Sequence, residues 1–173
     1  PGPMKDEKLT PRITETAKNL WYIYVGLNVI CTLSFWTAGM NFFDAICHSF
    51  ATIALGGFST HDASIGYFNS PAIELVAGFF SIVAAVNFAL FFLAWRSRSI
   101  RAIFRDAEFK FCMMVFGGII ATACAYLYWS GTFPLWESIY RGFFQTASII
   151  TDNGLGTVGY PADWPVFVPL LLL

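Results

Sequence analysis

The sequence predicts an all-α polytopic membrane protein, built from span–pore helix–span repeats with re-entrant filter loops. Three observations lead to this fold class. Hydrophobic residues make up 57% of the 173 residues and charged residues only 12%, whereas a soluble domain carries about 25% charged residues. Three windows without any charged residue are long enough to cross a bilayer. Two short glycine-centred segments, at 56–60 and 153–157, each follow an apolar run about half as long as a span.

The three charge-free windows are residues 19–43, 75–95 and 111–136. A helix needs about 20 apolar residues to cross the hydrocarbon core, and each window exceeds that length. We therefore expect three spans. A fourth apolar run, 164–173, is too short to cross, and the chain starts at a proline instead of an initiator methionine. We expect the sequence to be an excerpt of a longer protein that stops inside its last helix.

Basic residues predict the orientation of these spans. Nine of the ten Lys and Arg residues fall in two segments, 1–18 and 96–110. The positive-inside rule makes the first a cytoplasmic linker and the second a basic cytoplasmic loop. The linkers between the spans, 39–71 and 131–165, then face the outside. The net charge of −1 gives no reason to expect a nucleic-acid partner, and membrane lipid is the expected surrounding.

The first outward linker belongs to a predicted repeat over residues 19–95. Its segment 41–55 is apolar and lacks glycine and proline, which is typical of a re-entrant pore helix. Gly56 and Gly57 should end that helix, whose C-terminal carbonyls carry partial negative charge and favour a cation. Glycine also lets the next residues turn their carbonyls toward an axis, where they can replace the water shell of an ion. We place a filter at 55–59.

The second outward linker follows the same plan within a second repeat, 111–173, whose inner helix is truncated. An apolar segment, 135–151, predicts a second pore helix, and the break at 152–156 predicts a second filter. The glycines at the two breaks, Gly57 and Gly154, lie 97 positions apart. The outward spans begin about as far apart, so one period fits both landmarks and indicates a duplicated unit.

Two alternatives remain open at the second filter. Residues 157–160 spell Thr-Val-Gly-Tyr, most of a potassium-channel signature, which would move the filter to Gly159. We assign this stretch to the outward limb of the loop, because it lies past the helix break and is followed by proline. Asp152 and Asn153 either raise cation occupancy beside the filter or cap the turn.

Several other polar residues attract attention. His48 lies on the first pore helix, where a hydrogen bond within the bundle is expected rather than a metal site. His61 and Asp62 could form an external vestibule pair or belong to a solvated loop. Ser70 before Pro71 and Asp163 two positions before Pro165 each predict a helix start, and Asn87 should face the bundle interior. The four cysteines lack CxxC spacing, so no zinc or disulfide motif is supported.

The loop sequences resemble a known family. Residues 44–50 and 56–64 resemble the second pore loop of bacterial TrkH-type potassium-uptake proteins of the Trk/Ktr/HKT superfamily, and 151–155 resembles the third. The matching filter positions are Leu55, Gly56, Gly57, Phe58 and Ser59 in the first loop, and Asp152, Asn153, Gly154, Leu155 and Gly156 in the second.

This resemblance implies four repeats around a central pathway, of which the chain holds the second and most of the third. It further implies a homodimer in the bacterial inner membrane that works with a cytosolic, nucleotide-binding TrkA-type ring. The expected function is potassium uptake, with K⁺ as the transported ion, no cofactor and no enzymatic activity. The alternatives are a secondary transporter of another class with broken helices and a non-catalytic membrane subunit.

Overall fold

The structure is a computed structural model that describes residues 9–157. In this part of the chain all regular secondary structure is helical. The elements are α1 (Leu9–Thr37), α2 (Phe42–Ile53), the 3₁₀ helix η2 (Ser64–Phe68), α3 (Pro71–Ala85), α4 (Phe88–Ser97), α5 (Arg101–Arg105), α6 (Ala107–Trp129) and α7 (Leu135–Ile150).

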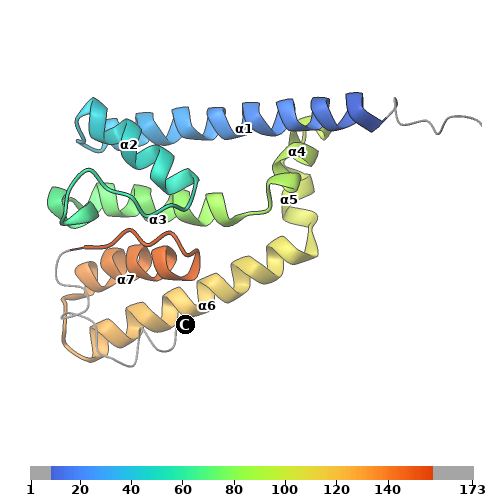
Figure 1. The fold of residues 1–173 in the computed structure, drawn as a ribbon. Coiled ribbons are helices and arrows are strands. Elements are labelled where there is room, and N and C mark those ends of the chain that lie inside the picture. Colours follow the sequence, from blue (N-terminus) through green and yellow to red (C-terminus); the bar gives the residue numbers. More distant parts are fainter. Residues whose placement is uncertain (1–8, 158–173) are drawn as a thin grey trace, which may run out of the picture.

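The long helices alternate with the two half-length helices. In Figure 1, α2 lies between α1 and α3, and α7 lies between α3 and α6. Both half-length helices lie at one end of the molecule, while α4 and α5 lie at the other end (Figure 1). Helix α3 packs against both α2 and α7, so it is the element that joins the two predicted repeats.

The two half-length helices form where the sequence predicts pore helices, within a few residues at each end. Helix α2 begins after Asn41, whose side-chain oxygen accepts a hydrogen bond from the backbone N–H of Asp44 at 2.8 Å. This satisfies one of the free donors at a helix N-terminus. Helix α7 begins after Pro134, whose backbone is extended and whose carbonyl accepts from the N–H of Ser138 at 2.9 Å.

The second predicted span is not one straight helix, contrary to the prediction from the window 75–95. Helices α3 and α4 meet at an angle of 83°. Val86 is extended, with φ −69° and ψ 138°, so the helical ladder ends there. Asn87 lies exposed at the break, whereas we expected it inside the bundle. An asparagine that hydrogen-bonds locally competes with helix, which fits a break at this point.

Two helices, Thr14–Thr37 of α1 and Ala107–Trp129 of α6, are long and apolar enough to cross a membrane. The bent pair α3 and α4 makes a third if it counts as one span. Helix α3 begins at Pro71 as predicted, but the side chain of Ser70 makes no capping hydrogen bond.

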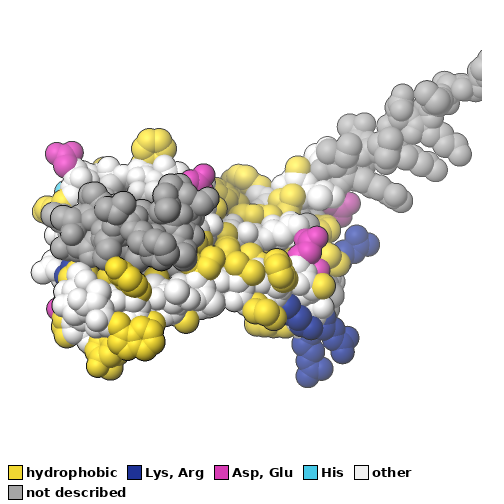
Figure 2. Space-filling model, turned by 90° about the horizontal axis from the view of Figure 1, so that it is seen from below, with side chains coloured by type: hydrophobic (Ala, Val, Ile, Leu, Met, Phe, Trp, Pro, Cys, Tyr) yellow, Lys and Arg dark blue, Asp and Glu magenta, His cyan; other side chains and the backbone are white. Residues whose placement is uncertain are grey.

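Close helix contacts hold the second half-length helix in place. A Cβ added at Gly78 of α3 would lie 2.7 Å from the Phe143 ring, and one added at Gly142 of α7 would lie 2.8 Å from the Cys124 sulfur. Small residues let helices approach in this way within membranes. Figure 2 shows most of the visible Lys and Arg side chains gathered at the end that carries α4 and α5, opposite the half-length helices.

Candidate functional site

The two glycine-centred segments meet in space. A Cβ added at Gly57 would lie 2.5 Å from the backbone oxygen of Asn153 and 3.4 Å from the Cα of Gly154. In the other direction, a Cβ added at Gly154 would lie 3.8 Å from the Cα of Gly57. The bends are 97 positions apart in the chain, yet their backbones are in contact. Only glycine fits at position 57 without a shift of the opposite segment.

The two half-length helices end in the same way, residue for residue. In each, two successive N–H groups after the last turn bond back to carbonyls of that turn, which is the Schellman arrangement. These bonds join Leu55 to Thr52 and Gly56 to Ala51 in α2, and Asp152 to Ile149 and Asn153 to Ser148 in α7. Every donor and acceptor of the first set has its counterpart 97 positions later, which supports a duplicated unit.

The residues that terminate these helices are not glycines, which corrects the prediction for Gly56. Leu55 and Asp152 adopt the left-handed conformation, with φ 50° and 59°. The second left-handed residue of each bend is the glycine, with φ 67° at Gly57 and 77° at Gly154. A non-glycine residue in this conformation costs roughly 1 kcal/mol, so tertiary packing must hold both bends.

The bends expose backbone carbonyls. Among residues 9–157, no hydrogen-bond donor reaches the carbonyls of 55–59 or 152–154. By contrast, the carbonyl of Leu155 accepts from the Ser148 hydroxyl at 2.6 Å, and that of Gly156 accepts from the N–H of Gly66 at 3.3 Å. The backbone oxygens of 55–59 and of 152–154 are therefore available to a ligand. They lie beside the C-termini of two helices.

Asp152 and Asn153 differ in their surroundings. The Asp152 side chain is exposed, whereas Asn153 is buried and donates from Nδ2 to the Ser81 hydroxyl at 2.7 Å. Ser81 belongs to α3 of the first repeat. The Asn153 side chain therefore ties the second bend to the neighbouring repeat. This bond could not be predicted from the pattern of residues, because its partners lie 72 positions apart.

The equivalent positions Phe58 and Leu155 also differ. The Phe58 side chain is 81% exposed, and that of Leu155 is 2% exposed. Leu155 belongs to the main apolar cluster, together with Phe35 of α1, Ile53 of α2 and Phe144 of α7. The second segment thus inserts its side chain into the core of the first repeat.

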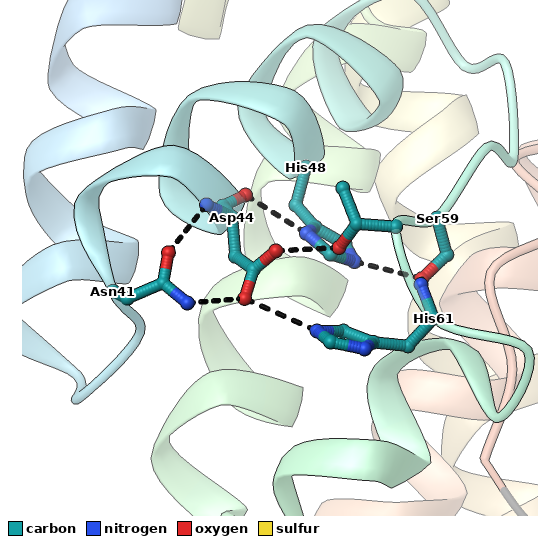
Figure 3. Close-up of polar contacts among 6 residues, drawn as sticks. Asn41, Asp44, His48, Ser59 and His61 are labelled. Carbon is teal, nitrogen blue, oxygen red and sulfur yellow. Dashed lines mark hydrogen bonds and ion pairs between the residues drawn. The ribbon is translucent and has the colours of Figure 1, made fainter.

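A polar network lies behind the first bend (Figure 3). The buried Asp44 carboxylate accepts hydrogen bonds from Asn41 Nδ2 at 2.6 Å, from the Thr60 hydroxyl at 2.6 Å and from His61 Nε2 at 3.1 Å. His61 therefore pairs with Asp44 across the loop and not with its neighbour Asp62. Burial alone would raise the pKa of Asp44, but the bonds from Thr60 and His61 outweigh it and lower that pKa.

His48 completes this network and is fully buried. Its Nδ1 lies 2.8 Å from the Asp44 carbonyl, and its Nε2 lies 2.9 Å from the Ser59 hydroxyl. Burial lowers the pKa of His48, which favours the neutral ring. The expected hydrogen bond within the bundle is confirmed. Within residues 9–157 no group of His, Cys, Asp and Glu is arranged to hold a metal ion.

Behind the second bend, a single side-chain hydrogen bond joins the half-length helix to the outward limb. Gln145 of α7 is buried and donates from Nε2 to the Thr157 hydroxyl. Gln145 stands 97 positions after His48, so both half-length helices hold the outward limb from the same position. The rest of the signature-like stretch, 158–160, and the predicted helix start at 163–165 lie outside the described residues.

Known proteins are similar to this chain in sequence and in architecture. A family model described as "TrkH: Cation transport protein" matches residues 1–172. The chain belongs to the TrkH family. The Trk system potassium uptake protein TrkH of Halomonas elongata is 48% identical over 99% of this chain, and TrkG of Escherichia coli K12 is 43% identical over 100%. The chain spans 36% of the length of each of these relatives.

The crystal structure of the potassium transporter TrkH from Vibrio parahaemolyticus superposes on this fold with a TM-score of 0.88 at 45% identity. The match covers 94% of this chain and 35% of that one. The all-α polytopic fold predicted from the sequence is confirmed. The family description and the names of the relatives denote transport proteins and not enzymes. The expected multi-pass protein of the bacterial inner membrane is confirmed.

Proposed function

We propose that the protein containing this chain takes up potassium, and that carbonyl oxygens of the bends at Gly57 and Gly154 coordinate the partly dehydrated ion. The observation that carries this proposal is the contact between the two bends. Two half-length helices direct their C-termini to one place, where their partial negative charges add. The carbonyls of 55–59 and 152–154, which no donor among residues 9–157 reaches, supply oxygens of the kind that line potassium filters.

The relatives support the choice of ion, because they are named as potassium uptake proteins. A complete ring of ligands would need further segments, and the relatives are nearly three times as long as this chain. We propose that two more repeats of the same kind close the ring. We extend the proposal to a homodimer and to a nucleotide-binding TrkA-type ring at the cytosolic side, where the basic loop 96–110 lies.

The break between α3 and α4 raises the rival reading of a transporter with broken helices. Such a transporter binds its substrate where discontinuous helices meet near the midplane. In this chain the two bends bring the left-handed residues Gly57 and Gly154 into contact, whereas Val86 is one extended residue within a single bent pair of helices. The bends are therefore the better candidates for an ion site.

The test is the selectivity of the full-length protein with Gly57→Ala. The new Cβ would lie 2.5 Å from the Asn153 oxygen, so one of the two segments must move. We expect ⁸⁶Rb⁺ uptake or the K⁺/Na⁺ permeability ratio to fall at least about tenfold. Gly131→Ala is the matched control, because Gly131 has the same left-handed backbone, with φ 69°, lies outside both bends, and an added Cβ there meets no atom within 4 Å. Wild-type flux and selectivity in Gly57→Ala would contradict the proposal.

A further inference from the structure

We propose that Asp44 and His48 are positioning residues for ion selectivity, which act by fixing the outward limb 59–61 of the first bend to its half-length helix. This inference rests on the proposed function, since it takes the bend at Gly57 as part of a filter. Neither side chain is offered as an ion ligand. Both act through the backbone that they hold.

Three successive residues of the limb are hydrogen-bonded to side chains of α2. Ser59 bonds to His48, while Thr60 and His61 both donate to the Asp44 carboxylate (Figure 3). These residues begin two positions after Gly57. A limb held at three consecutive positions leaves the preceding backbone little freedom, so the carbonyls of 57–59 keep one orientation.

The Asp44 carbonyl fixes the direction of each proton, because a carbonyl oxygen can only accept. His48 therefore carries a proton on Nδ1, which donates to that carbonyl. The neutral ring then accepts at Nε2 from the Ser59 hydroxyl, whose oxygen accepts from the His61 backbone N–H at 3.1 Å. Every group in this chain of bonds has one role, and a neutral histidine fulfils it.

The carboxylate is the centre of the arrangement. Asp44 is 3% exposed, and its two oxygens accept from three side chains of which two belong to the limb. A buried carboxylate with several donors is held firmly, because charge-assisted bonds are stronger than neutral ones. An asparagine at this position has only one acceptor oxygen, so it cannot satisfy all three donors.

The contacts of the limb 59–61 also extend to the second bend. The His61 ring stacks on Tyr67 of η2 with centroids 3.6 Å apart. The same short helix donates from the N–H of Gly66 to the Gly156 carbonyl, and its Ser64 hydroxyl accepts from the Gly156 N–H at 3.2 Å. Asp44 thus stands at one end of a continuous path of contacts that ends at the last candidate filter residue.

The test measures the K⁺/Na⁺ permeability ratio of the full-length protein in liposomes for Asp44→Asn. We expect the ratio to fall about tenfold, as for one lost charge-assisted hydrogen bond. The variant should still accumulate in the cell membrane, so that it can be purified for this measurement. Asp62→Asn is the matched control, because it removes the same charge from an exposed residue of the same loop. An unchanged ratio in Asp44→Asn would overturn the proposal.

Three further variants keep the test decisive if Asp44→Asn fails to accumulate. Thr60→Val removes one donor to the carboxylate at an exposed position, and it should also lower the ratio. His48→Gln should keep most of the wild-type ratio, because glutamine performs this task at position 145, whereas His48→Leu should not. Equal ratios in His48→Gln and His48→Leu would overturn the positioning role.

The outcome for Gly57→Ala separates this inference from the proposed function. If Gly57→Ala changes selectivity, while Asp44→Asn and Thr60→Val each leave it unchanged, the proposed filter is supported and the positioning role is wrong. If Gly57→Ala has no effect either, the proposed filter itself is wrong.

Discussion

The two bends have nearly the same backbone but are held in different ways. Both begin with a left-handed non-glycine residue and continue to a left-handed glycine two positions later. Behind the first bend, the acidic residue at the third position of the helix, Asp44, is buried and binds the outward limb. In α7 the position 97 residues after Asp44 holds Arg141. The acidic residue at the third position of that helix, Glu137, is partly exposed and lies 3.9 Å from Arg141.

The second bend is held instead by the first repeat. Asn153 bonds to Ser81 of α3, Leu155 enters the core of the first repeat, and Gly156 bonds to η2. The difference teaches that a duplicated backbone does not need duplicated supports. The first bend depends on its own half-length helix, and the second depends mainly on its neighbour.

The largest expected effect distinguishes the two glycines. Gly57→Ala brings a Cβ to 2.5 Å from a backbone oxygen, whereas Gly154→Ala finds its nearest neighbour at 3.8 Å. Both carry the strain of a left-handed alanine, about 1 kcal/mol, but only the first adds an overlap. We expect the K⁺/Na⁺ ratio to fall several-fold further in Gly57→Ala. Equal losses would mean that the strain alone matters and that the bends are not in tight contact.

The next effect is on stability and concerns Leu155 and Phe58. Leu155→Ala removes a fully buried side chain and should cost about 2–5 kcal/mol of unfolding free energy. Phe58→Ala changes a side chain that is exposed within residues 9–157 and should cost much less. Denaturant titration of the purified full-length protein measures both. An equal cost at Phe58 would show that another part of the protein covers it.

A smaller effect comes from the bond between Asn153 and Ser81. In a double-mutant cycle with Asn153→Ala and Ser81→Ala, we expect a coupling energy of about 0.6 kcal/mol, and at most about 1.7, as for hydrogen bonds between membrane helices. The same titration measures it. If the effects of the two substitutions are additive, the coupling energy is zero and this bond does not stabilise the second bend.

The smallest effect is expected at Glu137. Its ion pair with Arg141 is long, at 3.9 Å, and the Glu137 side chain is 38% exposed. Glu137→Gln should therefore change stability by less than about 0.5 kcal/mol and leave selectivity unaltered. A loss of selectivity comparable to that of Asp44→Asn would contradict the asymmetry between the two repeats.

The sequence predicted the outline of this fold because its signals are local. Charge-free windows, a basic loop and two glycine breaks at one period located the spans, the half-length helices and the bends. The left-handed Leu55 could not be foreseen, since leucine rarely takes this conformation and only packing imposes it. The break at Val86 lies in a charge-free apolar stretch where Asn87 is the one local sign of it, so the window alone suggests one continuous helix.

Side-chain contacts across the loops were the hardest to predict. The sequence leaves His61 either paired with its neighbour Asp62 or in a solvated loop, whereas its partner Asp44 lies 17 positions away. A local signal was nevertheless present. Asn41 followed by Asp44 has the spacing of a capping pair, which indicated that this carboxylate would face back toward the start of the helix and the loop beside it.

The central claim is that the bends at Gly57 and Gly154 line one cation path. The most direct test is a structure of the full-length protein with Rb⁺ or Tl⁺, in which anomalous scattering locates the ion. We expect a peak within coordinating distance of carbonyl oxygens from both 55–59 and 152–154. Peaks found only elsewhere, with these carbonyls bonded to protein or turned toward lipid, would contradict the claim.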